Sequence, residues 1–310
     1  MAAKAKRGKL TITLIGAGNL AHALGPALKS AGYKIDAVAF RGTPQSKKRA
    51  AALARKLGAE AVRLEDVMPI SDILWLCHTD DALVATSRSL ARKSGWKGKI
   101  VFHSSGALTS DVLRPLQRAG AHTASLHPMM TFVPGTTPRL QSVPFGVEGD
   151  RRAVAAARQI VRDLGAEAFA IKKGAKTLYH ALGSFTSPLI VATLVTAERV
   201  GRAAGLSRTQ TTKMMEPILR QTIKNYLERG AAAAFSGPIK RGDVETVRRH
   251  LKELRRVPEV SEVYRALVKS AVRDLPSLNR KELSRLLQNL ETRRKRVTRE
   301  RPGSKNLVLE

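Results

Sequence analysis

A glycine-rich stretch near the start of the chain is suited to holding phosphate groups. It reads Gly16-Ala-Gly-Asn-Leu-Ala21 and stands between an apolar run and an amphipathic helical pattern. In this spacing the first glycine permits a tight turn, the second lets the backbone approach a ligand, and Ala21 keeps the helix close to the strand. Free N–H groups at the helix start then stabilise two linked phosphates. We expect the pyrophosphate of a dinucleotide to be bound by Gly16, Gly18, Asn19 and Leu20.

The end of the next predicted strand should distinguish NAD from NADP. An acidic residue there binds the ribose hydroxyl of NAD, whereas an arginine accommodates the 2′-phosphate of NADP. The strand at 35–40 is followed directly by Arg41, and Asp36 lies at its opposite end. The sequence therefore favours NADP over NAD.

Three histidine motifs follow three later apolar runs, at His78-Thr-Asp-Asp81, His103-Ser-Ser-Gly106 and His127-Pro-Met-Met130. A lone histidine is more often a structural residue. Ligands of open α/β sheets bind beyond the carboxyl ends of the strands, so these motifs should share one rim. No metal site is predicted, because the sequence does not show the converging geometry of metal ligands. We expect cofactor contacts from His78, Thr79 and Ser104, substrate binding by Ser105, and catalytic orientation of the reacting group by His103 and His127.

A lysine and a histidine four residues apart begin the second half of the chain. Lys176 and His180 share one helix face. A lysine beside a carbonyl can donate a proton as a hydride arrives, provided that burial brings its pKa toward the working pH. The alternative is a solvated lysine at the start of a domain. We treat the two residues as candidate catalytic groups.

A basic loop further along the chain could bind the anionic end of a substrate. It reads Gly237-Pro-Ile-Lys-Arg-Gly-Asp243 and places Lys240 and Arg241 between glycines at the start of a helix. Turn formation with capping by Asp243 is the structural alternative.

The N-terminal half alternates short apolar runs with amphipathic helical stretches. That alternation is typical of a mostly parallel α/β sheet of the Rossmann type, covered by helices on both faces. The sequence predicts strands at residues 10–15, 35–40, 61–63, 72–77, 99–103, 122–126, 145–148 and 167–171.

After residue 172 the strand signals end and long helical patterns begin. Helices are expected at 176–204, 208–228, 243–255, 258–275 and 281–296. The change indicates an all-helical second domain, whose apolar faces could also bury against another subunit. We expect a Rossmann domain at 9–172, a helical substrate or dimerisation domain at 173–277, and a basic extension at 278–310 that is helical and then frays.

The net charge of +30 is the unusual feature of the composition. Its 55 Lys and Arg against 25 Asp and Glu would attract any polyanion through counterion release. The charge is spread along the chain, however, and aromatic residues make up only 4%, so the basic and aromatic interleaving that stacks on bases is missing. Nucleic acid is expected to bind only through non-specific electrostatic attraction.

The single cysteine, Cys77, excludes an internal disulfide framework and fits a reducing compartment. The apolar run Leu10–Ile15 is too short for a membrane span, and no cleavage motif follows it. We therefore expect a cytoplasmic protein with no membrane partner.

The chain resembles a bacterial family of Rossmann-like oxidoreductases whose C-terminal half is a domain of unknown function. The family is similar in architecture to 3-hydroxyisobutyrate dehydrogenase, pyrroline-5-carboxylate reductase and ketopantoate reductase. The resemblance implies an NADP-binding domain, a helical domain of the 6-phosphogluconate dehydrogenase C-terminal type, and a homodimer. It is carried, in order, by Gly16–Ala21, Phe102–Ala107, Ser125–Pro128, Leu178–Ala181, Ser236–Asp243 and His250-Leu251.

The chain departs from that wider group on the first long helix. The group's hydroxyacid dehydrogenases carry a catalytic lysine with an asparagine four residues later, and the resemblance implies this lysine role for Lys176. His180 occupies the asparagine position, and Pro188 follows Ser187 where an asparagine is expected. Because proline removes a helical N–H, we expect a kink there.

The leading hypothesis is an NADP-dependent oxidoreductase that moves a hydride to or from a small carbonyl, imine or hydroxy-acid substrate between the two domains. Lys176 or His180 would supply or accept the proton, and the cofactor would carry the hydride chemistry. The alternative is a non-catalytic protein that binds or senses NADP and acts through its helical domain.

Overall fold

The computed structural model describes residues 9–299, with side chains described up to residue 289. The chain divides into two compact units, unit 1 (Met1–Pro188) and unit 2 (Leu189–Glu310). Each unit has its own hydrophobic core. These units are defined by contacts. The predicted boundaries at residues 172 and 277 concern domains that fold independently, and they stay predictions.

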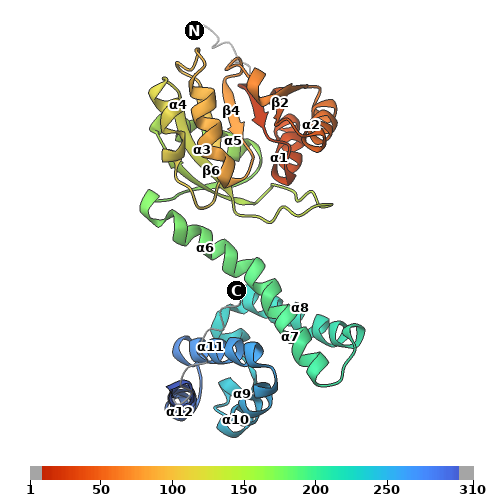
Figure 1. Cartoon of the computed structure of the whole chain (residues 1–310), viewed down its shortest axis with the longest axis vertical. Helices are drawn as coiled ribbons and strands as arrows, with labels where there is room; N and C mark the ends of the chain where they lie inside the picture. Colours follow the sequence, from red (N-terminus) through yellow and green to blue (C-terminus); the bar gives the residue numbers. More distant parts are fainter. Residues whose placement is uncertain (1–8, 300–310) are drawn as a thin grey trace, which may run out of the picture. The chain divides into compact units, whose positions relative to one another are not determined.

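Unit 1 contains an eight-stranded sheet in the order β3-β2-β1-β4-β5-β6-β7-β8. Strands β2, β4 and β6 of this sheet are labelled in Figure 1. Neighbouring strands run parallel except β6 and β7, which pair antiparallel. The chain order reverses between β1 and β4, which is where open α/β sheets bind their ligands. The strands are β1 (Thr11–Ile15), β2 (Lys34–Phe40), β3 (Glu60–Arg63), β4 (Ile73–Leu76), β5 (Ile100–His103), β6 (His122–Pro128), β7 (Pro144–Gly149) and β8 (Glu167–Ala170).

Two cores form because strand side chains alternate between the faces of the sheet. Along β4, Ile73 and Trp75 join one core, whereas Leu74 and Leu76 join the other. The first core packs α1 (Asn19–Ser30), α2 (Pro44–Leu57) and α5 (Arg151–Asp163), and the second packs α3 (Asp80–Ala91) and α4 (Arg114–Arg118). The mostly parallel Rossmann-type sheet covered on both faces is confirmed, and each predicted strand is present.

The predicted helix from 176 to 204 is wrong as a single element. The chain forms α6 (Lys176–Thr186) and α7 (Pro188–Ala203), with Ser187 between them at φ −133° and ψ −86°. A proline disfavours helical backbone in the residue before it and is well suited to the first position of a helix. The sequence analysis predicted only a kink at Pro188, and the structure shows a full break, which leaves α6 in unit 1.

Unit 2 is helical over the part that the structure describes. A small core joins α10, α11 and the first turns of α12 through Val247, Leu251, Val268, Leu283 and Leu286. The predicted helix at 281–296 is therefore present, and its first turns are packed. The end predicted to fray, residues 293–310, is helical up to Arg299, and residues 300–310 lie outside the described residues. The helices are α7, α8 (Arg208–Ala234), α9 (Gly237–Lys240), α10 (Val244–Glu253), α11 (Pro258–Asp274) and α12 (Arg280–Arg299).

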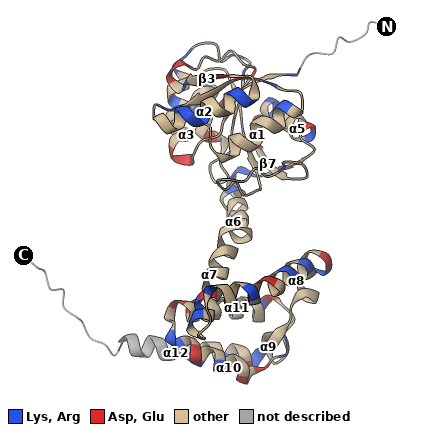
Figure 2. Cartoon of the chain, turned by 90° about the vertical axis from the view of Figure 1, so that its right-hand side faces the viewer, with Lys and Arg blue, Asp and Glu red and all other residues tan. Residues whose placement is uncertain are grey.

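Lys and Arg residues occur on helices of both units (Figure 2). The ion pairs between described residues lie mostly at the surface, such as Arg199 with Glu259 at 2.8 Å and Arg220 with Glu216 at 2.9 Å. Exposed pairs of this kind add little stability. The distribution agrees with the expectation of a diffusely basic surface.

Candidate functional site

Gly16 makes the turn that follows β1. Its φ of +100° lies in the left-handed region, and its N–H donates to the carbonyl of Ala39 at 2.9 Å. A Cβ here would lie 3.3 Å from the backbone nitrogen of His78. Both the backbone conformation and the close approach call for glycine. The tight turn expected of the first glycine in the motif is present.

Gly18 precedes α1 and leaves the start of that helix open. No side chain among the described residues caps α1, so its first N–H groups remain available to an anion. A Cβ on Gly18 would meet only the carbonyl oxygen of Cys77, at 3.5 Å. The protein's own packing therefore does not require glycine here, and close approach by a ligand is the physical reason that remains.

A pocket of about 530 Å³ opens at this loop, and we call it the Gly16 pocket. Its volume is in the usual range for small-molecule and cofactor sites. The structure brings to it every residue that the sequence predicted for cofactor binding: Gly16, Gly18, Asn19, Leu20, Arg41, His78, Thr79 and Ser104. Ser104 Oγ there accepts a hydrogen bond from Trp75 Nε1 at 2.8 Å.

The pocket also contains residues that the sequence analysis missed. Thr43, Ser46 and Arg49 belong to the start of α2, where the Thr43 side chain caps the helix by accepting from Ser46 N–H. The polar run after Arg41 could have identified them, because a capped helix begins there. Phe132 comes from the long connection between β6 and β7, and no sequence signal pointed to it.

Asn19 links three parts of the Gly16 pocket. Its side-chain oxygen accepts a hydrogen bond from Arg49 Nη2 at 3.0 Å, and its side-chain nitrogen donates to the Phe132 carbonyl at 3.0 Å. An uncapped helix start, a glycine that packing does not need and two exposed arginines, Arg41 and Arg49, together suit a ligand with several phosphates. The residues present fit a dinucleotide with an additional phosphate.

A second group of polar side chains lies at the ends of β6 and α6. We call Ser125, His127, Lys176, Tyr179 and His180 the Lys176 cluster. Lys176 is only 1% exposed, and its Nζ donates to Ser125 Oγ at 2.5 Å. The His127 and His180 rings meet edge to face, with centroids 5.9 Å apart. The predicted candidate catalytic residues Lys176, His180 and His127 are therefore neighbours.

Glycines let α6 approach the sheet closely. A Cβ on Gly106 would lie 2.3 Å from Cδ2 of His180 and 2.8 Å from Nε2 of His127. A Cβ on Gly146 would lie 2.6 Å from the Tyr179 ring. Real side chains do not tolerate such contacts, so these two glycines are required for the cluster to form. Ser104 lines the Gly16 pocket two residues before Gly106, which places the cluster beside the pocket along the chain.

Two carboxylates, the buried Glu148 and the exposed Asp80, act on the charge of Lys176. Glu148, 6% exposed, accepts from the N–H of Ser110 at 2.6 Å and from its hydroxyl at 2.8 Å. Asp80 accepts from the Ser105 hydroxyl at 2.8 Å. Burial lowers the pKa of Lys176, and the charges of Glu148 and Asp80 oppose that shift.

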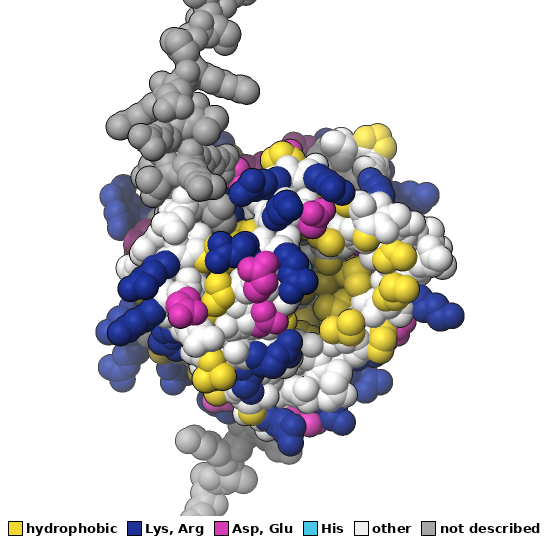
Figure 3. Space-filling model, turned by 90° about the horizontal axis from the view of Figure 1, so that it is seen from below, with side chains coloured by type: hydrophobic (Ala, Val, Ile, Leu, Met, Phe, Trp, Pro, Cys, Tyr) yellow, Lys and Arg dark blue, Asp and Glu magenta, His cyan; other side chains and the backbone are white. Residues whose placement is uncertain are grey.

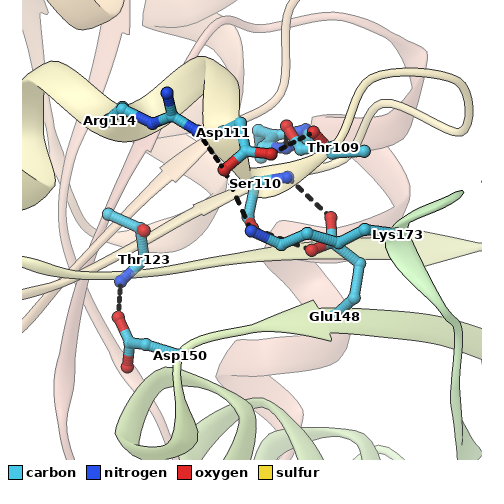
Figure 4. Close-up of polar contacts among 9 residues, drawn as sticks. Thr109, Ser110, Asp111, Arg114, Thr123, Glu148, Asp150 and Lys173 are labelled. Atoms are coloured by element: carbon cyan, nitrogen blue, oxygen red, sulfur yellow. Dashed lines mark hydrogen bonds and ion pairs between the residues drawn. The ribbon is translucent and has the colours of Figure 1, made fainter.

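The turn before α6 is held by a polar network (Figure 4). Lys173 Nζ donates to Asp111 at 3.0 Å, and the same carboxylate pairs with Arg114 at 3.1 Å. Because Lys173 lies three residues before Lys176, this contact fixes the start of the helix that carries the cluster. Each ion pair is partly exposed and individually weak.

His127 is half-buried and neutral near physiological pH. Burial, with the charges of Lys176 and His180, lowers its pKa to about 4. Its Nδ1 lies 3.0 Å from the Tyr179 hydroxyl, which also accepts from Gly146 N–H at 3.2 Å. Sequence analysis did not identify Tyr179 as a site residue, although it stands three residues after Lys176 and so shares its helix face.

The geometry speaks against the predicted roles of His103 and Ser105. His103 is fully buried, Nε2 lies 3.2 Å from the Thr109 carbonyl, and Nδ1 accepts from Ser105 N–H at 3.1 Å. Burial lowers the pKa of His103 to about 3. The Ser105 hydroxyl donates to Asp80 and accepts from the N–H groups of Ala107 and Leu108. Both side chains stabilise the loop after β5 and have no capacity left for a substrate.

Lys240 and Arg241 lie in unit 2, at the end of α9. The Lys240 carbonyl accepts from Leu278 N–H at 3.0 Å, and the Asp243 side chain caps α10 by accepting from Thr246 N–H at 3.0 Å. The structural alternative of turn and cap is therefore present. Their predicted role in substrate binding stays a prediction. Among the described residues, no group of three or more His, Cys, Asp or Glu could hold a metal ion.

Family models match both halves of the chain. A Rossmann-like domain matches residues 1–128, and a domain of unknown function, DUF2520, matches residues 143–271. Each match covers less than half of the chain, and the two lie one after the other along it. The Lys176 cluster draws on both matches, because Ser125 and His127 lie in the Rossmann-like domain and the α6 residues lie in DUF2520.

Solved structures share this fold at low sequence identity. A candidate NADP oxidoreductase, BF3122 from Bacteroides fragilis, is 24% identical with a TM-score of 0.70, covering 85% of this chain and 98% of its own. Protein TM1727 from Thermotoga maritima is 21% identical with a TM-score of 0.67, covering 90% and 99%. An imine reductase from Myxococcus stipitatus, in complex with NADP⁺, is 18% identical with a TM-score of 0.60, covering 85% and 94%. No curated protein matches the chain.

Proposed function

We propose that the protein is an NADP-dependent oxidoreductase acting on a small carbonyl, imine or hydroxy-acid substrate. The observation that carries the proposal is the Gly16 pocket, where an uncapped helix start, Gly18 and two arginines converge. The structural neighbours named as an NADP oxidoreductase candidate and an NADP⁺-bound imine reductase support the same class of activity.

NADP is favoured over NAD by the residues after β2. Arg41 and Arg49 line the pocket, with Ser46 and Thr43 between them. Guanidinium and hydroxyl groups bind a phosphate through charge-assisted hydrogen bonds. The described residues after β2 that line the pocket include no Asp or Glu to bind a ribose hydroxyl.

The Lys176 cluster supplies the proton chemistry beside the cofactor. A bound nicotinamide supplies or takes up the hydride. In the reductive direction Lys176 or His180 gives a proton to the substrate heteroatom, and in the oxidative direction the same group takes it back. Glu148 and Asp80 help Lys176 to keep its charge in a buried place.

A turnover screen with the full chain tests the activity. NADPH consumption is followed by absorbance with a panel of 2-keto acids, 3-keto acids and cyclic imines, and NADP⁺ reduction with the matching hydroxy acids. We expect at least one substrate class to be turned over with NADPH and more slowly with NADH. Absence of turnover in both directions, with intact NADPH binding, would contradict the enzyme proposal.

The burial of Lys176 favours a second candidate function. Its ammonium is 1% exposed and bound to Ser125, which also suits a purely structural lysine. A non-catalytic protein that binds NADP and acts through its helical region would show this geometry. Such a protein binds NADPH and turns over none of the panel.

We further propose that the protein is a cytoplasmic homodimer joined through α7. This helix is exposed and apolar, with Val191 at 58% and Val195 at 50% exposure. From Pro188 to Ala197 it carries no Lys, Arg, Asp or Glu. A chain of net charge +30 can pair with its own copy most easily through such an uncharged face. Hydrophobic side chains gather around a hollow in the view of Figure 3.

Residues Lys173–Ala203 also pass a length and hydropathy test for a membrane span. Lys176 and Tyr179, at the start of this stretch, form hydrogen bonds to residues of β6. These contacts favour a second copy of the chain, rather than a bilayer, as the partner that covers the apolar face. Light scattering after gel filtration tests this. Val195→Glu should convert a dimer into a monomer, whereas Lys213→Glu, at an exposed position on α8, should not. A monomeric wild-type protein would contradict the proposal.

A further inference from the structure

His127 is the one ring of the Lys176 cluster whose hydrogen bonds reveal which nitrogen carries the proton. Three contacts meet at the Tyr179 hydroxyl: Gly146 N–H at 3.2 Å, His127 Nδ1 at 3.0 Å and the His127 carbonyl at 3.3 Å. The amide of Gly146 can only donate, and a carbonyl can only accept. The hydroxyl has one proton to give.

All three contacts are satisfied by one arrangement. The Tyr179 hydroxyl donates to the His127 carbonyl, and it accepts from Gly146 N–H and from His127 Nδ1–H. If Tyr179 instead donated to Nδ1, its contact with the carbonyl would have no proton. Because the ring is neutral, a proton on Nδ1 leaves Nε2 as a bare acceptor.

The acceptor nitrogen is open. Among the described residues, His78 Nε2 and Ser87 Oγ are the buried side-chain atoms without a hydrogen-bond partner. Nε2 of His127 is not one of them, and the hydrogen bonds within the described part of the chain include none to it. Nε2 of His127 therefore has no hydrogen-bond partner among the described residues and is not fully buried. It is exposed to solvent and available to a ligand.

We propose that Tyr179 and Gly146 hold His127 in the Nδ1–H tautomer, so that Nε2 accepts a hydrogen bond from a hydroxyl or N–H group of the substrate beside its reacting carbon. This inference rests on the proposed function and narrows it. A neutral acceptor needs a donor, so the substrate carries such a neutral donor next to the carbon that exchanges the hydride.

The charges in the reaction balance with these roles. In the oxidative direction the reacting carbon loses a hydride to the cofactor, and its hydroxyl loses its one proton to the neutral amine of Lys176 or to His180. The product is a carbonyl. His127 neither gains nor loses a proton, because its Nε2 accepts from a different group of the substrate. His127 is thus an orienting group rather than the acid or base.

The tautomer can be measured without any substrate. The full chain is labelled with [¹⁵N]histidine, and long-range ¹H–¹⁵N correlations at pH 7 show which ring nitrogen carries the proton. The His127 signal is assigned by its loss in His127→Gln. We expect a protonated Nδ1 and an unprotonated Nε2. A proton on Nε2 overturns the proposal, whether or not the protein binds NADPH.

His250 provides an internal comparison. Its Nδ1 lies 2.9 Å from the Tyr264 hydroxyl in a similar edge-to-face pair, but the described residues give Tyr264 no backbone donor and acceptor of the kind that fix Tyr179. Tyr179→Phe should shift His127 toward the Nε2–H form and leave the His250 signals unchanged. An unchanged His127 signal in Tyr179→Phe would also count against the proposal.

A pair of variants tests the acceptor role in turnover. The side-chain oxygen of glutamine can replace Nε2 as acceptor, whereas asparagine is too short to reach that position. With a substrate that carries this donor, His127→Asn should lose about 10-fold more kcat/KM than His127→Gln, as expected for one lost hydrogen bond. Equal losses in the two variants, or the same difference with a substrate that lacks the donor, contradict the acceptor role of Nε2. If the wild-type protein does not bind NADPH, the proposed function is refuted, whereas the result on the His127 tautomer remains valid.

Discussion

The Gly16 pocket and the Lys176 cluster are built in different ways. The pocket depends on backbone, since a left-handed glycine, an open helix start and a capped helix leave N–H groups and arginines facing one space. The cluster depends on side chains from β6 and α6, which are brought into contact by close approaches at Gly106 and Gly146. Backbone sites tolerate most nearby changes, whereas the cluster is sensitive at every member.

The largest expected effect separates catalysis from binding. Lys176→Met keeps the length and buried stem of the side chain and removes the charge. If Lys176 is the proton donor, kcat should fall by about 10²- to 10⁴-fold, while the dissociation constant of NADPH stays unchanged. Steady-state kinetics and NADPH fluorescence measure the two quantities.

Lys172→Met, an exposed lysine in the same segment, is the control for charge loss. His180→Gln tests the alternative donor. If His180→Gln loses the activity and Lys176→Met does not, the proton role belongs to His180. If neither variant loses activity, the cluster is not the catalytic site.

The second effect concerns the pocket alone. Gly18→Leu adds a side chain where packing leaves room, since its Cβ would meet only the Cys77 carbonyl at 3.5 Å. NADPH affinity should fall by about 100-fold or more, because the new side chain occupies the phosphate position. Thermal unfolding should shift by less than about 3 °C. Gly174→Leu, in open space outside the pocket, should leave NADPH affinity unchanged.

The sequence predicted the Gly16 pocket well and the Lys176 cluster only in part. The pocket was predictable because Gly16, Gly18 and Arg41 are local features at the ends of strands, and the alternating pattern fixed the order of those strands. Tyr179, Gly146 and Ser125 were missed because their roles depend on contacts across more than thirty residues of chain. His103 looked equivalent to His127, yet local backbone groups satisfy both of its nitrogens. No spacing rule distinguishes the two.

The third effect tests the choice of cofactor. Arg41→Ser should weaken NADPH binding by about 10- to 100-fold, the usual value of a charge-assisted hydrogen bond, with little effect on NADH. Arg55→Ser makes the same charge change at an exposed position on α2 outside the pocket. Equal losses for both cofactors in Arg41→Ser would argue that this arginine does not contact the 2′-phosphate.

The last effect concerns pH and stability. The folded-state pKa of His103 is about 3, below its unfolded value, so the unfolded chain binds more protons in acid. The contribution of the neutral His103 ring to the free energy of unfolding is complete above about pH 6.5 and is lost as the pH falls toward 3. The loss is about 3 kcal/mol at pH 4. Urea unfolding between pH 7 and pH 4 measures this. His103→Gln should show a shallower dependence, and an identical slope would contradict the buried neutral ring.

The claim on which the account depends is that the Gly16 pocket binds a dinucleotide phosphate. Isothermal titration calorimetry of the wild-type chain with NADPH measures it directly. The account predicts one site per chain, with a dissociation constant below about 100 μM and weaker binding of NADH. Absence of binding heat at millimolar NADPH would contradict it.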